Sequence, residues 1–447
     1  MKNIALISLG CAKNLVDSEV MLGYLANDGY TFVSQPKDAD IIIINTCGFI
    51  QPAKNEAVDS IRMALDLKKN KRHIKVFVTG CYIERNSEEL EEQFPGIDGW
   101  LGVNDFDKIV QVVEGKAHEK AAFSFLYDHQ SPRFQSTPSG WAYVKISEGC
   151  SHSCSFCTIP LIKGSYRSRP IVSIVNEVER LASKGVKEIN LISQDSTYYG
   201  RDLHLSDGLS MLLEKLVEIK PISWIRILYG YPEEVTNRLL EIMQEDKICS
   251  YLDIPFQHSD PGIIKKMRRG LDGEQALERI RKIRDKLPDV AIRTSLIVGF
   301  PGEGQKEFEN LEHFVRKARF NHLGIFTYSL EQGTKSYAQG DPIGTNEKKR
   351  RKDRLMSIQS EISYLINGKY LNLSLEVLVE GHLERDSSVL LGRTQFQAPE
   401  VDGVVFIDTQ EQEHEHEHEH ADDKINSIQK VEINSRDIYD LYGVFKR

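Results

Sequence analysis

Three cysteines lie within one short run of the sequence, Gly149-Cys-Ser-His-Ser-Cys-Ser-Phe-Cys157, directly after an apolar strand pattern at 141–148. Thiolates at this spacing can hold three irons of a [4Fe–4S] cube, whereas four thiolates normally close such a cluster. The next cysteine, Cys249, is far along the chain and belongs to no comparable motif. Cys150, Cys154 and Cys157 therefore predict an iron–sulfur cluster at the end of a strand, with its fourth iron open to a reactant.

A zinc site is the alternative interpretation of these cysteines. Zinc knuckles need a fourth Cys or His at regular spacing, and only His152 is near. Because His152 lies inside the loop, coordination of the same ion would strain the loop. The spacing favours the iron–sulfur interpretation.

The C-x-x-x-C-x-x-C spacing after a strand pattern resembles the signature of radical S-adenosylmethionine (SAM) enzymes. The resemblance implies that SAM occupies the open iron through its amino and carboxylate groups.

The N-terminal segment alternates apolar strand patterns with helical ones, which predicts an open parallel α/β sheet. The expected strands are 3–9, 40–45 and 74–79, and the expected helices are 17–27, 52–69 and 87–94. Each strand pattern leads into a cysteine: Cys11, Cys47 and Cys81. Because ligands bind beyond the carboxyl ends of parallel strands, we expect these thiols to converge on a second iron–sulfur cluster with an open iron. For any one of them alone, a small buried core residue is the alternative.

A second series of strands and helices follows a linker-like segment at 119–140. The expected strands are 142–147, 188–193, 225–230, 251–257, 291–299 and 322–329, and helical patterns between them include 174–183, 233–245, 273–286 and 307–318. This series predicts a partial (β/α)6 barrel with its active site at the C-terminal ends of the strands. The loop with Cys150 follows the first of these strands, on that face.

Other residues near the ends of the barrel strands become candidates for holding SAM. A guanidinium near a strand end can pair with the SAM carboxylate in a bidentate manner, which favours Arg293, and Phe156 is placed to cover an adenine. For each candidate an ordinary rim residue, or for Phe156 packing under the loop, is the alternative. The candidates are Phe156, Gln194, Asp195, Gln257, His258, Arg293 and Thr294.

The C-terminal segment is expected to form a small antiparallel β-barrel after a helical pattern at 346–364. Its expected strands are 374–380, 389–394, 404–408 and 428–433. Alternating Glu and His at 411–420 is a low-complexity run, and we expect it to form a loop.

The formal net charge of −9 is unevenly distributed. From Lys369 onward the chain has 8 Lys and Arg against 17 Asp and Glu, so the preceding part is neutral. A surface that lies on RNA should be basic, because neutralising phosphates supplies much of the affinity. The acidic segment instead favours a basic protein partner, and direct nucleic-acid binding is not expected. The basic run at 348–352 is expected to be a solvated helix face.

With these features, the whole chain resembles the methylthiotransferases, a radical SAM family with an N-terminal three-cysteine domain, a radical SAM barrel and a C-terminal TRAM barrel. The corresponding ranges are 1–118, 136–366 and 369–440. The start, Ser8-Leu-Gly-Cys-Ala-Lys-Asn-Leu-Val-Asp-Ser-Glu19, is especially similar to the branch that modifies an aspartate of ribosomal protein S-twelve. A sister branch that modifies tRNA adenosine usually reads Gly-Cys-Gln-Met-Asn here, so Lys13 points to the protein-modifying branch.

The resemblance implies transfer of a methylthio group to the β-carbon of the target aspartate. It implies two [4Fe–4S] clusters, SAM, an electron donor and a basic small-subunit ribosomal protein as substrate, with no catalytic residue beyond the cluster cysteines. Two alternatives stay open: methylthiolation of a tRNA adenosine, and a non-catalytic iron–sulfur carrier or zinc-braced scaffold.

The composition indicates the class of protein and the kind of cellular compartment in which it works. A chain of 447 residues with 40% hydrophobic and 28% charged residues is typical of a globular protein with several domains. Seven cysteines, clustered where a metal could use them, fit a reducing compartment better than a disulfide framework. The apolar run at the start is too short for a signal peptide, and no transmembrane length is present. We therefore expect a cytoplasmic protein without a membrane partner.

Overall fold

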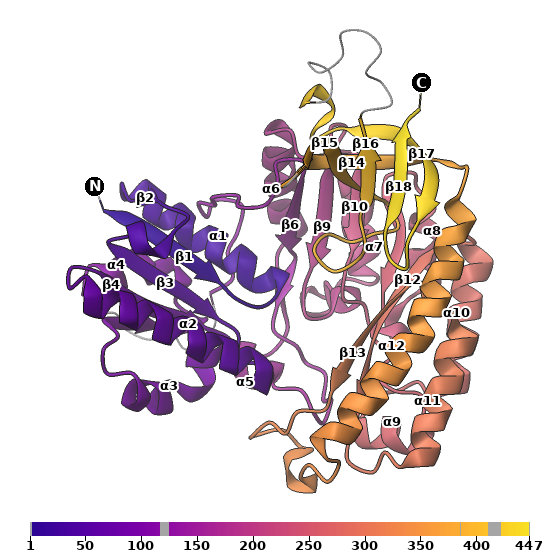
Figure 1. Cartoon of the computed structure of the whole chain (residues 1–447), viewed down its shortest axis with the longest axis horizontal. Helices are drawn as coiled ribbons and strands as arrows, with labels where there is room; N and C mark the ends of the chain where they lie inside the picture. The colour runs from indigo at the N-terminus through magenta and orange to yellow at the C-terminus, as the bar shows by residue number, and fades with distance from the viewer. Residues whose placement is uncertain (1, 117–124, 385, 410–421, 447) are drawn as a thin grey trace.

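The computed structural model describes residues 2–116, 125–384, 386–409 and 422–446. Figure 1 shows three parts, with an N-terminal α/β domain beside a central open barrel and a small β-barrel packed on one end of the central barrel. The predicted Glu–His loop at 411–420 and the segment 117–124 of the linker lie outside the described residues.

The N-terminal domain is an open, fully parallel sheet, as the alternating pattern predicts. Its strand order is β2-β1-β3-β4-β5. The strands are β1 (Asn3–Ser8), β2 (Thr31–Phe32), β3 (Ile41–Thr46), β4 (Lys75–Gly80) and β5 (Gly99–Leu101). The chain moves from β1 outward to β2 and then crosses to β3 on the other side, so the loops after β1 and β3 lie at the crevice where such sheets bind ligands.

Helices cover both faces of this sheet. They are α1 (Ala12–Asn27), α2 (Gln51–Asn70), α3 (Cys81–Gln93) and α4 (Ile109–Val113). Every residue of β3 is buried, and its isoleucines alternate between two hydrophobic clusters: Ile41 and Ile43 in one, Ile42 and Ile44 in the other. Burial on both faces explains the continuous apolar run, which distinguishes a parallel strand from a half-exposed one.

The central sheet is a partial barrel of parallel strands in the order β13-β12-β11-β10-β9-β6, as predicted. The strands are β6 (Trp141–Lys145), β9 (Glu188–Ile192), β10 (Trp224–Ile227), β11 (Ile248–Asp253), β12 (Ala291–Val298) and β13 (His322–Thr327). The sheet does not close on itself between β13 and β6. After β6 the chain forms the short antiparallel pair β7 (Ser147–Glu148) and β8 (Arg167–Ser168), with α5 (Ile159–Lys163) between them.

Helices cover the outer face of the partial barrel. They are α6 (Ile171–Ser183), α7 (Gly208–Leu216), α8 (Asn237–Ile242), α9 (Pro261–Met267), α10 (Gly273–Lys286), α11 (Gln305–Ala318) and α12 (Thr345–Asn367). Their apolar stripes meet the strands in one large core cluster. Figure 1 shows α10, α11 and α12 along one side of the barrel.

The C-terminal part is a closed β-barrel in the order β14-β15-β16-β18-β17. Its strands are β14 (Ser374–Leu383), β15 (Asp386–Thr394), β16 (Val405–Asp408), β17 (Ile428–Arg436) and β18 (Leu441–Phe445). One pair, β16 and β18, is parallel, and the others are antiparallel as expected. The sequence pattern does not predict β18, which lies beyond the residue at which the predicted range 369–440 ends.

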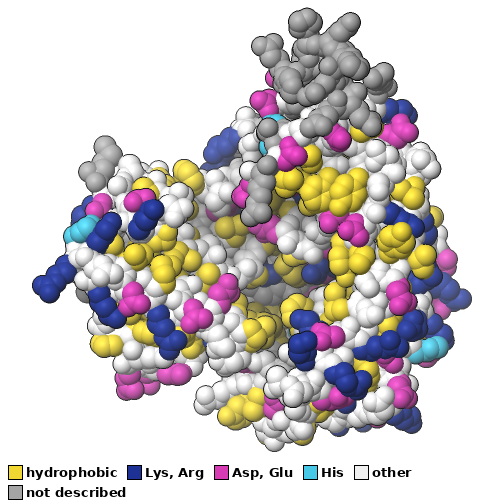
Figure 2. Space-filling view, viewed as in Figure 1, with side chains coloured by type: hydrophobic (Ala, Val, Ile, Leu, Met, Phe, Trp, Pro, Cys, Tyr) yellow, Lys and Arg dark blue, Asp and Glu magenta, His cyan; other side chains and the backbone are white. Residues whose placement is uncertain are grey.

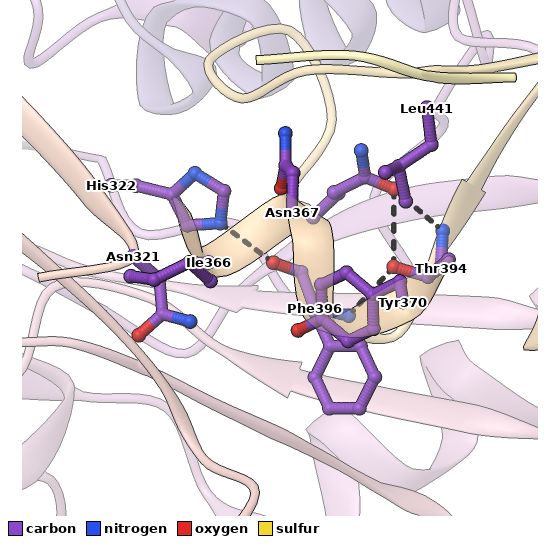
Figure 3. Close-up of a pocket in the computed structure, with 9 residues that line it drawn as sticks. Asn321, His322, Ile366, Asn367, Tyr370, Thr394, Phe396 and Leu441 are labelled. Atoms are coloured by element: carbon purple, nitrogen blue, oxygen red, sulfur yellow. Dashed lines mark hydrogen bonds between the residues drawn. The ribbon is translucent and has the colours of Figure 1, made fainter. Parts of the chain in front are cut away.

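The small barrel seals the end of the central barrel where its strands begin. Glu188, the first residue of β9, accepts hydrogen bonds from Arg226 and from Arg393 of β15, and all three side chains are buried. Tyr251 donates to Asp402 at 2.7 Å. The pocket in Figure 3 lies at this junction, between His322, Tyr370 and Phe396. Reactants must therefore enter the central barrel at its opposite end, where the strands finish.

Within the described part of the chain, no helix has both the length and the apolar character needed to cross a membrane.

Candidate active site

The three N-terminal cysteines lie on loops that touch each other. Cys11 immediately precedes α1, Cys47 follows β3, and Cys81 is the first residue of α3. A Cβ atom built on Gly10 would lie 2.8 Å from Cys47 Cβ and 3.2 Å from its Sγ, and one built on Gly48 would lie 3.0 Å from the Cys81 carbonyl carbon. The loops at the carboxyl ends of these strands therefore lie against one another, and the role of their three thiols as cluster ligands stays a prediction.

The electrostatics of this group fit a cationic metal centre. Burial raises the pKa of the Cys47 thiol to about 11, and burial raises the pKa of the Cys81 thiol further; the neighbouring Cys11 adds to both shifts. Because these thiols influence each other and two of them are at least partly buried, an all-thiolate state would be stabilised by a bound cation, and iron is a natural thiolate partner. Asn14 joins the loops, because its Nδ2 donates to Leu9 O and Thr46 O.

Gly10 is the residue that lets the first two loops approach. Its φ of +96° belongs to the region that favours glycine, and the space beside it is occupied by Cys47. Gly29 offers a matched comparison, since its φ is +86° but a Cβ there would meet nothing within 4 Å.

We expect Gly10→Ala to lower the free energy of unfolding by roughly 2 to 4 kcal/mol, because it adds both backbone strain and a clash with Cys47. Gly29→Ala adds the strain alone and should cost about 1 kcal/mol. Anaerobic urea denaturation of the two variants measures the difference. Equal losses would mean that the contact between the cysteine loops is not tight.

The second set of cysteines lies on the loop between β7 and α5, at the end of the barrel where the strands finish. Cys150 N donates to Gly164 O at 3.1 Å, and Ser155 N donates to Met267 O at 3.0 Å. Gly149 adopts a φ of +82° where a side chain would meet the carbonyl of Ser165. These bonds fix the loop backbone and leave the cysteine side chains for a ligand.

Burial raises the pKa of Cys150 to about 11 and that of Cys157 to about 12, and the neighbouring thiols add to both shifts. The guanidinium of Arg269 opposes them, and its Nη1 lies 3.8 Å from Cys154 Sγ. None of the seven cysteines forms a disulfide. The donor set, three partly buried thiols beside one cation, fits an iron–sulfur cluster that a small reactant can still reach.

Three stacked side chains form a wall beside Cys154. The Arg269 guanidinium lies 3.6 Å from the centre of the Tyr231 ring, and His152 stacks on the same ring at 3.9 Å with planes 14° apart. His152 Nε2 lies 2.5 Å from Asp195 Oδ2. His152 is thus engaged by other residues. Among the described residues, the two cysteine sets included, no three His, Cys, Asp or Glu side chains are arranged to hold a single metal ion.

Two of the candidate SAM residues lie next to this loop. Gln194 Nε2 donates to Glu148 Oε1 at 2.7 Å, and its Oε1 is buried without a protein partner. Asp195 contacts His152 and accepts from Thr197 N at 3.0 Å. Phe156 is partly buried against Ile263, Met267, Phe300 and Tyr328. These contacts are those of a residue that packs under the loop, which is the alternative to covering an adenine.

The other candidates are engaged within the protein. Gln257 has a left-handed φ of +71°, and its backbone bonds to Ser295 and Ile297. The Thr294 hydroxyl donates to Ile254 O and accepts from Phe256 N. Arg293 is the third residue of β12, and its guanidinium faces Asp253 and Asp402. His258 is fully buried beside Glu303. Their roles toward SAM stay predictions.

Helix α1 joins the two sets of cysteines. Its apolar residues Ala12, Val16 and Val20 pack with Trp141 and Tyr143 of β6. Its Asp17 contacts both Lys145 and Lys163, and Lys145 also donates to Glu148 at 2.6 Å. All four ionic side chains are at most 3% exposed. Since α1 begins after Cys11 and Glu148 precedes Cys150 by two residues, this buried network positions one site against the other.

Two further groups reinforce the junction. Glu19 of α1 binds Arg133, which also binds Glu177 of α6. On the other side, buried Glu331 accepts from Lys54 and Arg85, and Arg85 donates to Gly48 O beside Cys47. Figure 2 shows the surface hollowed between the N-terminal domain and the rest of the molecule.

Sequence patterns do not reveal this junction or Arg269. The network residues lie in stretches that alternate polar and apolar side chains, which is compatible with exposure, and Arg269 follows α9 without any motif around it. One signal was present: Lys145 and Glu148 interrupt an otherwise apolar strand pattern directly before the cysteines.

Comparison with known families matches all three parts. The Uncharacterized protein family UPF0004 matches residues 3–102, the Radical SAM superfamily matches residues 144–315, and the TRAM domain matches residues 373–445.

Curated relatives match over nearly the full length. The chain is 41% identical to the ribosomal protein uS12 methylthiotransferase RimO of Geotalea uraniireducens, over 99% of this chain and 98% of the relative. It is 42% identical to the RimO proteins of Dictyoglomus thermophilum, over 99% of both chains, and of Aquifex aeolicus, over 98% of this chain and 96% of the relative. The chain belongs to the RimO family. The predicted methylthiotransferase resemblance is thereby confirmed, and the protein is a radical SAM transferase that works with an iron–sulfur cluster and SAM.

Solved structures agree with the RimO family fold. The radical SAM methyltransferase TsrM of Kitasatospora setae aligns with a TM-score of 0.53 at 14% identity, over 74% of this chain and 73% of that one. The cobalamin-dependent radical enzyme OxsB aligns with a TM-score of 0.50 at 13% identity, over 81% of this chain and 56% of that one. At these identities the likeness establishes the fold alone.

Proposed function

We propose that this protein transfers a methylthio group to the β-carbon of an aspartate in ribosomal protein uS12. The observation that carries the proposal is the pair of three-cysteine sites joined by α1 at one domain junction. A protein that only carried electrons would need neither an open site nor a second one facing it. The uS12 substrate is the one for which the relatives at 40–43% identity are named.

In this proposal Cys150, Cys154 and Cys157 hold one [4Fe–4S] cluster, and the other three cysteines, Cys11, Cys47 and Cys81, hold a second. When bound, the two clusters and SAM supply a 5′-deoxyadenosyl radical and a methylated sulfur, the species needed to replace a hydrogen on an unactivated carbon. Because the cofactors carry this chemistry, no protein general base is required.

The chain's own residues bind and orient the reactants, and they exclude water from the site. The wall of Arg269, Tyr231 and His152 covers one side of Cys154. Gln194 presents a buried amide oxygen without a protein partner, which suits an amino group of SAM. The C-terminal barrel closes the far end of the central barrel, so a radical formed at the strand ends has no second exit to water.

The acidic C-terminal segment supports a basic protein as partner. The described strands of the small barrel carry acidic side chains such as Glu376, Glu380 and Glu432. Complementary charge would act mainly on the rate and specificity of encounter with a ribosomal protein.

An external electron donor belongs to the same proposal. The basic run of α12 is only partly the solvated face that the sequence predicts, because Lys348 and Arg351 are buried and paired with Asp341 and Glu303. Less of that run is therefore left for RNA.

Mass spectrometry tests the proposal. We expect reconstituted protein incubated with SAM, sulfide and dithionite to add one sulfur and one CH2 to an aspartate-containing peptide of uS12. The same mixture with tRNA is the matched arm, and modification of tRNA alone would replace this proposal with the sister activity. Failure to form 5′-deoxyadenosine in either arm would favour a non-catalytic carrier.

A further inference from the structure

We propose that Lys13 binds the side-chain carboxylate of the target aspartate and selects it against other residues. This inference rests on the proposed function and names the residue that recognises its substrate. Lys13 is the second residue of α1, two positions after Cys11, and is 9% exposed. Its Nζ lies 3.3 Å above the centre of the Tyr229 ring and 3.3 Å from Ser193 O.

The ammonium of Lys13 lacks the counterion that the neighbouring lysines have. Lys145 and Lys163 both contact Asp17, whereas no carboxylate in the described part of the chain lies within ion-pair distance of Lys13. An ammonium has three N–H donors, and Ser193 O accepts from one of them. Cys11 and Asp253 lie near enough to favour this charge but accept no hydrogen bond from it, so its remaining N–H donors can take an anionic partner that arrives with the substrate.

Other cations near the two sites already have partners. Arg293 is held by Asp253 and Asp402. Arg85 and Lys54 share Glu331. Arg269 lies beside Cys154 and donates to Pro255 O, on the side assigned to the SAM cluster. Among these side chains, the charge available to a substrate carboxylate is that of Lys13.

The position of Lys13 suits the chemistry. Its backbone is next to one cysteine site, and Ser193 directly follows β9, on the rim of the barrel that carries the other site. A carboxylate held by Nζ would place the β-carbon, one bond away, between the two sites. Fixing the reacting atom in this way supplies much of the advantage of a bound over a free substrate.

The backbone conformation of Tyr229 is an independent indication that this site is functional. It follows β10 with a φ of +61°, a left-handed conformation that is unusual for an aromatic residue. Such backbone strain persists where the surrounding structure requires it, often at functional sites. Here it brings the ring beneath the ammonium, which holds Lys13 through a cation–π contact instead of through a carboxylate.

The test compares two substrates with matched enzyme variants. One substrate is recombinant uS12, and the other carries asparagine in place of the modified aspartate. We expect the unaltered enzyme to prefer aspartate by roughly 100-fold in kcat/KM. Asparagine lacks the carboxylate that would pair with the buried ammonium of Lys13, and losing one partner of such a pair has an effect of this size. Lys13→Met should lose about 100-fold on aspartate and show little preference, whereas Lys13→Arg should retain part of it. Lys349→Met, on the exposed face of α12, is the control.

The iron content of the Lys13 variants checks that the adjacent cysteine site is still loaded, and Lys349→Met should match the unaltered enzyme in iron content, in 5′-deoxyadenosine formation and on both substrates. An unaltered kcat/KM of Lys13→Met on uS12 would overturn the inference, and so would equal losses on both substrates, which indicate a structural role. Failure of the unaltered enzyme to modify uS12 would refute the proposed function itself, so the two failures are distinguishable.

Discussion

Replacing Cys11, Cys47 and Cys81 together with alanine is expected to abolish methylthiolation of uS12 while SAM cleavage continues. The loop with Cys150 does not depend on these side chains, because its backbone is fixed by Gly164 and Met267 and its wall by Arg269. We therefore expect reduced protein with SAM to form 5′-deoxyadenosine at a rate within about threefold of the unaltered enzyme, without a methylthio product. Chromatography of the nucleoside and mass spectrometry of uS12 measure the two outcomes separately.

The converse variant, with Cys150, Cys154 and Cys157 replaced by alanine, should form neither 5′-deoxyadenosine nor product. The pair of variants is its own control, because each removes three thiols from the same chain. If the N-terminal variant also stopped SAM cleavage while it kept its fold, the two sites would not have the separate roles assigned to them.

Asp17→Ala is expected to lower the free energy of unfolding by about 3 to 5 kcal/mol, because it leaves Lys145 and Lys163 buried against each other with one carboxylate fewer. The loss should appear in urea denaturation of the anaerobic protein. Asp353→Ala removes a carboxylate that pairs with Lys349 on the surface of α12, and should cost less than about 1 kcal/mol. A similar small loss for Asp17→Ala would mean that the buried network does not hold the domains together.

The same network predicts an acid sensitivity. Burial opposes the charge of Glu148, but Lys145 and Lys163 outweigh it and hold the pKa of Glu148 at about 2, below its ordinary value of 4.5. A carboxylate with a depressed pKa stabilises the fold fully above its ordinary value, and this contribution is lost as the pH falls toward 2. Glu148→Gln should remove this dependence, which urea denaturation at pH 7 and at pH 3 measures.

The strand and cysteine patterns predict the architecture well because burial determines both. The fully buried β3 and the helix–strand alternation follow from apolar periodicity, and parallel strands bring Cys11, Cys47 and Cys81 to one edge. Short elements at the sheet edges, β2 and β5, make too few apolar contacts to leave a pattern. Strand β18 alternates over five residues at the end of the chain and was not predicted.

The domain junction could not be predicted, since it depends on polar residues that meet only in the folded chain. The apolar periodicity predicts a helix over 17–27, whereas α1 begins at Ala12. Its first turns carry Lys13, Asn14 and Asp17, which look exposed in sequence and are buried against the barrel and the cysteine loops. Arg293 illustrates the same limit, because its chemistry suits a SAM carboxylate but Asp402 from the C-terminal barrel reaches it.

The iron content of anaerobically reconstituted protein tests the central claim most directly. Two [4Fe–4S] clusters give about eight irons per chain in the unaltered protein, and about four in each of the two triple-alanine variants. A value of about four in the unaltered protein, unchanged when Cys11, Cys47 and Cys81 are replaced, would contradict the account.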